Sequence, residues 1–183
     1  VMEVLTFAGL PSVLFTDIPD DGMVARFADC RGIGIASTAR SHGPEWMEAN
    51  LPEPLAFLDR LGAPILHYKI CSTFDSSPES GSIGKAIENG LRLRPADAVP
   101  LLPAAPAMRR YQAFGHLFAA GIDGIYRLDR HPVMSHHPVT PMAESDLLRH
   151  LSAQTQLPGA LIDLEALAAD PQARLDQLLG RGI

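Results

Sequence analysis

The chain of 183 residues holds enough sequence for one domain, or for one domain with a small attachment. Its composition, 46% hydrophobic and 20% charged, is that of a globular protein with a sizeable core and excludes a disordered chain. The formal net charge is −6 with neutral histidines and no basic stripe is visible, so nucleic acid is not expected as a partner. A few local Arg and Lys can still bind a small anionic ligand.

Membrane and secreted proteins are disfavoured by the sequence. No segment approaches the roughly 18 uninterrupted apolar residues of a membrane span, and no basic start followed by an apolar run marks a signal peptide. Cys30 and Cys71 lie far apart and match no CxxC or zinc spacing, so we expect reduced thiols. We therefore expect a cytoplasmic protein without a membrane partner.

Short apolar runs alternate with helical patterns along the chain. Runs rich in β-branched and aromatic residues indicate strands, and apolar residues at helical spacing indicate helices. The clearest strand is 64–71, whereas 103–141 is irregular and rich in Pro, His and Arg. In chain order we predict helix 1–9, strand 12–15, strand 32–37, helix 44–61 with a break or kink near Pro52 and Pro54, strand 64–71, helix 82–91, strand 98–102, helix 147–151, strand 160–163 and helix 165–179.

This alternation favours an α/β fold with a layered, mostly parallel sheet flanked by helices. In such sheets ligands bind beyond the carboxyl ends of the strands, so the turns after strands are the places to search for a site. No capping residue precedes the first helix at Val1, and the last helix runs toward Ile183, where a further strand is typical. We therefore expect residues 1–183 to form part of a domain that is cut at both ends.

The densest group of polar residues follows the clearest predicted strand, over residues 68–85. Lys69, several hydroxyl groups and Asp75 come first, and two glycines then allow close backbone approach before a helix whose free N–H groups favour an anion. This mixture suits a polyhydroxylated carboxylate. In the alternative interpretation, Asp75 or Ser82 merely caps the helix. The pattern G-x-x-x-x-G-K-[ST] is absent, so the segment is not a nucleotide-binding P-loop.

Two other segments carry candidate chemistry. Arg40, which follows the predicted strand 32–37, can clamp a carboxylate through two parallel hydrogen bonds or can be a solvated loop residue. Three histidines, at 131, 136 and 137, lie among prolines, with no paired carboxylate or cysteine at a metal-binding spacing. We expect no metal site there, and prefer hydrogen bonds that fix the loop or contact with a ligand. The nucleophile elbow G-x-S-x-G is also absent.

The polar segments together resemble a known family. The run Tyr68-Lys69-x-Cys71-Ser72-Thr73-Phe74-Asp75-Ser76, followed by Gly81-Ser82-Ile83-Gly84, resembles the signature of the four-carbon acid sugar kinase family, which includes 3-oxo-tetronate, threonate and erythronate kinases. Three further segments agree in order: Ser37-x-x-Arg40, Pro103-Ala104-Ala105-Pro106 leading to Arg110 and Gly115, and His137-Pro138-Val139-Thr140-Pro141-Met142. The resemblance spans about residues 1–165.

The resemblance implies a protein of two α/β domains, of which the first binds the sugar acid and the second binds ATP with Mg²⁺. This chain would be the first domain, which binds a small four-carbon sugar acid and has no cofactor of its own. Assembly into a homo-oligomer is compatible with the resemblance. The positions that the resemblance assigns to substrate binding are Arg40, Lys69, Ser72, Thr73, Asp75, Ser76, Gly81, Ser82, Gly84, Arg110, His137 and Thr140.

Departures from the family pattern limit what this chain can do alone. The family's G-D-D-F-T-G-type turn, with its substrate-activating aspartates, would lie upstream of Val1, so the chain by itself is expected to be inactive. Arg109 stands where close relatives have glycine. The alternatives to a kinase domain are a stand-alone module that binds a sugar acid without catalysis, and an α/β domain whose pocket is unused.

Overall fold

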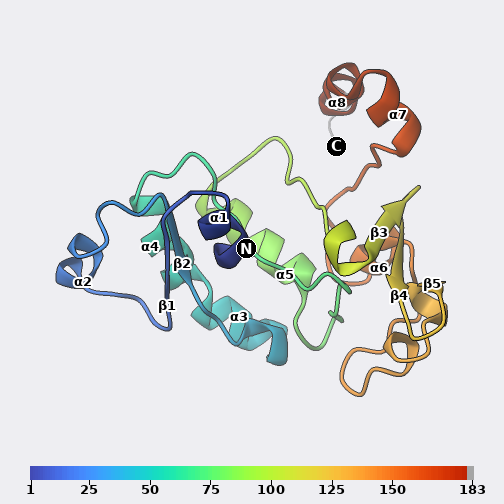
Figure 1. Ribbon diagram of the computed structural model, residues 1–183, viewed down its shortest axis with the longest axis horizontal. Helices are drawn as coiled ribbons and strands as arrows, with labels where there is room; N and C mark the ends of the chain where they lie inside the picture. The colour runs from blue at the N-terminus through green and yellow to red at the C-terminus, as the bar shows by residue number, and fades with distance from the viewer. Residues whose placement is uncertain (181–183) are drawn as a thin grey trace.

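Two lobes and a C-terminal pair of helices, joined by extended segments, make up the computed structural model, which describes residues 1–180 (Figure 1). Residues 181–183, the end of the predicted domain, lie outside the described residues. The first lobe contains α1 (Met2–Phe7), β1 (Ser12–Phe15), α2 (Asp21–Ala25), β2 (Gly32–Ile35), the 3-10 turn η1 (Ala39–Ser41), α3 (Pro44–Asn50), α4 (Pro52–Arg60) and α5 (Ile83–Leu93). The second contains η2 (Pro106–Met108), β3 (Arg110–Ala113), β4 (His116–Ala120), β5 (Ile125–Arg127), η3 (Leu128–Arg130), η4 (Met134–His136) and α6 (Leu147–Ser152).

The first lobe is built on a small parallel sheet and five helices. β1 pairs with β2 in parallel, with Ser12 opposite Gly32. Helix α1 packs on this sheet, because a Cβ at Gly34 would lie 3.3 Å from the Met2 sulfur. Helices α3, α4 and α5 enclose a separate core of Ala39, Met47, Leu51, Leu55 and Ala86. The predicted break near Pro52 is confirmed, since α3 ends before this proline and α4 begins with it.

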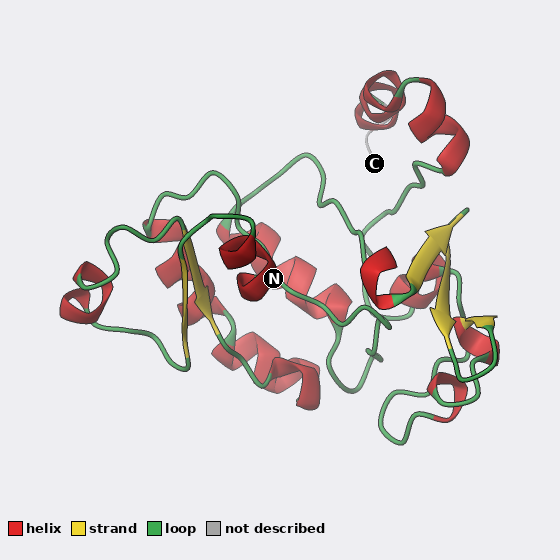
Figure 2. Ribbon diagram, viewed as in Figure 1, coloured by secondary structure: helices red, strands yellow, loops and turns green. Residues whose placement is uncertain are grey.

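The second lobe is an antiparallel sheet of three strands, β3–β4–β5, covered by α6 and short 3-10 turns (Figure 2). β3 and β4 are joined by a two-residue turn, in which Phe114 and Gly115 have φ of 48° and 81°. Positive φ at both central residues matches the twist of a hairpin. The core of this lobe also takes up residues of the first half of the chain, and its buried members are Phe74, Ile83, Leu117, Ala119, Leu128, Met134, Met142, Leu147 and Leu151.

The prediction of a mostly parallel sheet is wrong for the described residues. They form a mixed α/β structure with one two-stranded parallel sheet and one three-stranded antiparallel sheet. The segment 103–141, predicted to be irregular, holds all three antiparallel strands. These strands are three to five residues long and carry Arg, Gln and His, so their alternation is too short and too polar to be recognised.

Three of the predicted strands, 64–71, 98–102 and 160–163, are extended loops. In the first of them the side chains still alternate as in a strand: Leu66 and Tyr68 pack against the core of the first lobe, while Ile65 is 77% exposed. A strand also requires a neighbour to complete its backbone hydrogen bonds. The described part of the chain supplies none for this segment, so sequence alternation alone overestimated the sheet.

The predicted C-terminal helix 165–179 is two helices, α7 (Leu164–Ala169) and α8 (Pro171–Leu179). They separate at Asp170, whose extended φ of −145° is the conformation favoured before proline. Asp163 and Asp170 each cap the helix that follows through a side-chain oxygen. Among residues 1–180, no helix has both the length and the apolar character that crossing a membrane requires.

Arg109 ends η2 with φ of 57° and ψ of 45°, in the left-handed region, at a position where the family resemblance implies glycine. A non-glycine side chain in this conformation destabilises the folded state by about 1–2 kcal/mol. Glycine removes this strain, but it makes the unfolded chain more flexible, which offsets about half of the gain in stability. We expect Arg109→Gly to raise the free energy of unfolding by up to about 1 kcal/mol, measured by urea denaturation. A loss of stability would contradict this assignment of strain.

Candidate functional site

The centre of the candidate site is a charge pair between two loops of distant sequence. Arg40, in η1 directly after β2, donates from Nη2 to Oδ2 of Asp75. The Asp75 side chain is only 3% exposed, whereas that of Arg40 is 57% exposed. Thr73 Oγ1 donates to the other carboxylate oxygen, Asp75 Oδ1, at 2.7 Å. Both oxygens of this buried carboxylate are therefore occupied, and the guanidinium that it holds faces solvent.

Close backbone contact holds the same two loops together. The Gly81 amide donates to the His42 carbonyl at 2.8 Å. Gly81 has φ of 62°, and a Cβ at this position would lie 2.6 Å from the carbonyl oxygen of Arg40. Only glycine combines this backbone conformation with such an approach. The close contact with Gly81 thus fixes the backbone position of Arg40.

A cavity of about 370 Å³ lies beside this pair, and its lining residues come from η1 and from the turn after η4: Arg40, Ser41, His137, Val139 and Thr140. His137 Nδ1 accepts hydrogen bonds from the backbone amides of Thr140 at 3.1 Å and Val139 at 3.4 Å. Because Nδ1 accepts, the neutral ring carries its proton on Nε2. That N–H has no acceptor among the described residues and can donate to a ligand in the cavity.

Hydrogen bonds that fix turns account for the other histidines of the Pro-rich segment. His131 Nδ1 accepts from the Met134 amide at 3.2 Å, and His136 Nδ1 lies 2.9 Å from Ser135 Oγ. The expectation of loop-fixing hydrogen bonds is confirmed for these residues. In the described part of the chain, no three His, Cys, Asp or Glu side chains are grouped so that they could hold a metal ion. We assign no ligand for Mg²⁺ to residues 1–180.

The N-terminus of α5 does not offer the free N–H groups that the sequence predicted. The amides of Ile83 and Gly84 donate to Gln154 Oε1 at 2.8 and 3.3 Å. The Lys85 amide donates to Ser82 Oγ at 3.1 Å. Ser82 is therefore a helix cap, and Gly84 is a packing position inside the helix. The prediction of an anion site at this helix end is wrong, because the side chains of Gln154 and Ser82 already accept the hydrogen bonds of its backbone amides.

Ser76, another predicted site residue, is buried at 1% exposure and holds the loop from within. Its hydroxyl donates to the Phe74 carbonyl at 2.9 Å and lies 3.0 Å from His150 Nε2. His150 Nε2 also lies 3.1 Å from the Ser76 carbonyl oxygen, which can only accept, so this nitrogen carries the ring proton. Ser76 supports the site without lining the cavity.

Lys69, Ser72 and Arg110 are not brought to the cavity. Lys69 is exposed on the extended segment 64–71 and has no hydrogen bond or ion pair to any residue that the structure describes. Ser72 is half-buried. Arg110 begins β3 and donates from Nη1 to the backbone carbonyls of Met108 and Arg109 at 2.9 and 3.2 Å. Ser41 and Val139 lie in segments that the sequence singled out, although neither was named as a site residue, and His150 and Gln154 were not predicted.

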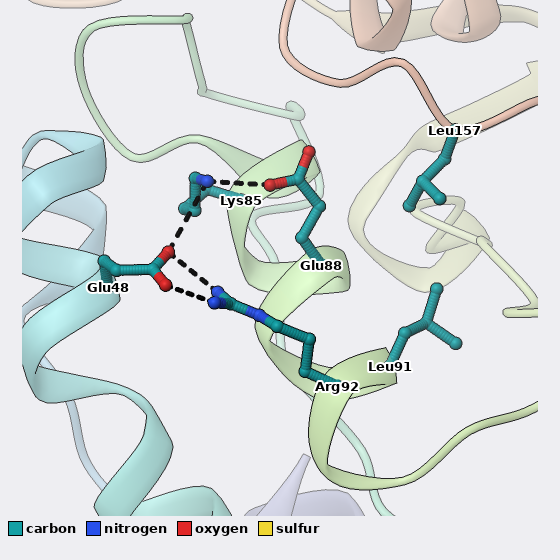
Figure 3. A pocket seen from close by; sticks show the side chains of 6 residues that line it. All are labelled: Glu48, Lys85, Glu88, Leu91, Arg92 and Leu157. Atoms are coloured by element: carbon teal, nitrogen blue, oxygen red, sulfur yellow. Dashed lines mark hydrogen bonds and ion pairs between the residues drawn. The ribbon is translucent and has the colours of Figure 1, made fainter.

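A second, larger hollow of about 690 Å³ lies on the surface of α5, and its lining residues are Glu48, Lys85, Glu88, Leu91, Arg92 and Leu157 (Figure 3). Its charges are paired with one another: Arg92 and Lys85 both contact Glu48, and Lys85 Nζ is 2.7 Å from Glu88. The hydrogen bond from Arg92 lowers the pKa of Glu48 to about 2. None of the lining residues of this hollow lies in a segment that carries the family resemblance, whereas Arg40, His137 and Thr140 do, so we locate the site at the smaller cavity.

Burial beside Ser76 lowers the pKa of His150 below 6.5, although its hydrogen bond to Ser76 and the charge of Glu144 act in the opposite direction. A lowered pKa means that the folded chain binds fewer protons than the unfolded chain, so the free energy of unfolding should fall as the pH drops through about 6.5. His150→Gln should reduce this loss, measured by urea denaturation between about pH 7.5 and about pH 5.5. Equal losses in both proteins would contradict a buried neutral His150.

Three comparisons with known proteins identify relatives of the chain. A family model described as a sugar-binding N-terminal domain matches residues 1–183. The chain is 52% identical over 179 residues to a 3-oxo-isoapionate kinase of Paraburkholderia graminis, a match that covers 97% of this chain and 38% of the kinase. It is 32% identical over 184 residues to a 3-oxo-tetronate kinase of Pseudomonas fluorescens, covering 99% of this chain and 41% of that kinase.

Solved structures show the same architecture. A Salmonella typhimurium LT2 protein, provisionally described as a tRNA synthase, matches with a TM-score of 0.82 at 27% identity, over 99% of this chain and 42% of that one. A Haemophilus influenzae protein of the DUF1537 family matches with a TM-score of 0.79 at 24% identity, over 94% of this chain and 40% of that one. The chain thus spans about two fifths of the length of these relatives.

Proposed function

The chain belongs to the sugar-binding N-terminal domains of the four-carbon acid sugar kinase family, and from this premise we propose that its 370 Å³ cavity holds the sugar acid of a kinase. The observation that carries the proposal is the solvent-facing Arg40 held by the buried Asp75 at the cavity wall. A fixed cation beside hydroxyl and imidazole donors is the set of groups that a polyhydroxylated carboxylate requires.

Three of the cavity residues have a role in this proposal. The Arg40 guanidinium carries five N–H donors, of which Asp75 takes one, so a substrate carboxylate can bind two of the others in parallel. His137 Nε2–H donates to a keto or hydroxyl oxygen. Thr140, whose hydroxyl lies 3.1 Å from His137 Nδ1, holds this ring in place. The loop of Arg40 therefore binds the carboxylate of the acid, and the turn at 137–140 binds an oxygen of its carbon chain.

The substrate class follows from the relatives. We propose a 3-oxo sugar acid, with 3-oxo-isoapionate as the first candidate, because the 3-oxo-isoapionate kinase is 52% identical and the 3-oxo-tetronate kinase of Pseudomonas fluorescens 32% identical. This chain spans about two fifths of the length of these kinases, and ATP and Mg²⁺ would be bound by the other three fifths of a protein of that length. Phosphoryl transfer depends mainly on positioning and electrostatics, so this domain contributes by orienting the acid.

Calorimetric titration of the 183-residue chain tests the binding role. The ligands are 3-oxo-isoapionate, 3-oxo-tetronate, threonate and erythronate, with threitol as the control that keeps hydroxyl groups and lacks the carboxylate. We expect at least one acid to bind and threitol to give no heat. Absence of binding by all four acids would overturn the proposal. With ATP and Mg²⁺ present, turnover by this chain alone would instead overturn the division of labour between domains.

A further inference from the structure

One amide side chain, that of Gln154, joins the two ends of the loop that directly follows Asp75. Its Oε1 accepts from the backbone amides of Ile83 and Gly84 at 2.8 and 3.3 Å. Its Nε2 donates to Ser76 Oγ at 2.9 Å. The loop between Ser76 and Ile83 is thus closed by a residue more than 70 positions later in the chain, which lies just beyond the Ala153 cap of α6.

The packing around Gln154 leaves its side chain little freedom. A Cβ at Gly84 would lie 2.8 Å from the Gln154 carbonyl group and 2.9 Å from its Cβ, so the two backbones touch. The backbone amide of Gln154 donates to the Leu151 carbonyl at 2.7 Å, which anchors the residue to α6. The neighbouring Thr155 Oγ1 donates to Glu88 of α5 at 2.8 Å. Gln154 is therefore placed by α6 and reaches the loop from a fixed backbone.

The route from Gln154 to the cavity runs through Ser76, Asp75 and Arg40. The Ser76 hydroxyl, which accepts from Gln154, donates to the Phe74 carbonyl at 2.9 Å, so Asp75 lies between two restrained neighbours. Phe74 has φ of 58° and a fully buried side chain. A non-glycine residue in this region costs about 1–2 kcal/mol and persists only where its surroundings hold it.

From these contacts we propose that Gln154 is a positioning residue for sugar-acid binding, which sets the place of Asp75 and through it the direction of Arg40. The inference rests on the proposed function of the cavity. Gln154 touches neither the cavity nor its ligand, since the lining residues come from η1 and from the turn at 137–140. Its effect on the ligand is carried by the Ser76 hydroxyl and the Phe74–Asp75 backbone.

The test is calorimetric titration of the chain with the best-bound sugar acid. Gln154→Met keeps the length of the side chain and removes all three hydrogen bonds, and should weaken binding about tenfold with unchanged stoichiometry. Gln154→Glu keeps the acceptor for the two helix amides and loses the donor to Ser76, so its dissociation constant should lie between those of wild type and Gln154→Met. Gln156→Met, at an exposed glutamine nearby, is the matched control and should bind as wild type.

Stoichiometry separates positioning from a general loss of folding. A residue that only stabilises the fold would lower the fraction of binding-competent chains and leave the dissociation constant unchanged, and that result would overturn the inference. Unweakened binding by Gln154→Met would also overturn it. Should Gln154→Met fail to fold, a wild-type dissociation constant for Gln154→Glu would do the same. If wild type binds none of the acids, the proposed function fails, and the inference with it.

Discussion

Asp75→Asn is expected to weaken sugar-acid binding by about tenfold to a hundredfold, or roughly 1.4–2.8 kcal/mol. The variant keeps the volume of the side chain but removes the charge that holds Arg40, and presents an amide group where the guanidinium donates. Loss of the carboxylate also frees positive charge for the ligand, which acts in the opposite direction. Because the Arg40 side chain is 57% exposed, water screens that gain, and the loss of orientation dominates.

Asp129→Asn is the matched control for this change. Asp129 is also a largely buried carboxylate, 13% exposed, and it also pairs with an arginine, Arg127, at 2.6 Å. It does not line the cavity. The control should lose stability without losing affinity, as measured by the same titration. Equal affinities of Asp75→Asn and wild type would show that the Arg40–Asp75 pair does not orient the ligand.

Gly81→Ala should lower the free energy of unfolding by about 2–4 kcal/mol and abolish measurable binding. Its φ of 62° is strained for alanine, and the added Cβ would meet the Arg40 carbonyl oxygen at 2.6 Å. This backbone atom cannot rotate away as a side-chain end could. The two loops must therefore separate, and Arg40 moves with its loop. Urea denaturation and titration measure the two effects.

Gly62→Ala separates the cost of the backbone conformation from the cost of the contact. Gly62 has φ of 72°, and a Cβ there would meet nothing within 4 Å. Because alanine also makes the unfolded chain less flexible, this control should lose only up to about 1 kcal/mol of stability and keep wild-type affinity. If both variants lose the same stability, the approach of Gly81 to Arg40 is not the contact that joins the loops.

The sequence singled out residues that lie together in the structure, whereas it misjudged the sheets around them. Arg40, Asp75 and the His137–Thr140 turn were all singled out, and the structure brings them to one place. They were recognisable because each is a charged or hydrogen-bonding group in a motif of the family. Lys69 belongs to the same motif but stays exposed on an extended segment. A motif identifies residues of a site without placing each of them at its centre.

Long-range contacts explain what the sequence did not predict. Gln154 and His150 act on the loop at Ser76 across more than 70 residues, and no local pattern marks either of them. The anion site at the start of α5 failed for the same reason, because its donors are satisfied by that distant amide. The segment 64–71 has the alternation of a strand, but pairing depends on a neighbour that alternation cannot reveal.

A crystal structure of the chain with a bound sugar acid tests the central claim most directly. We predict the carboxylate within hydrogen-bonding distance of the Arg40 guanidinium, with an oxygen of the carbon chain on His137 Nε2 and Asp75 still paired behind. An acid bound instead at the surface hollow of Glu48 and Arg92, with the cavity beside Arg40 empty, would contradict it.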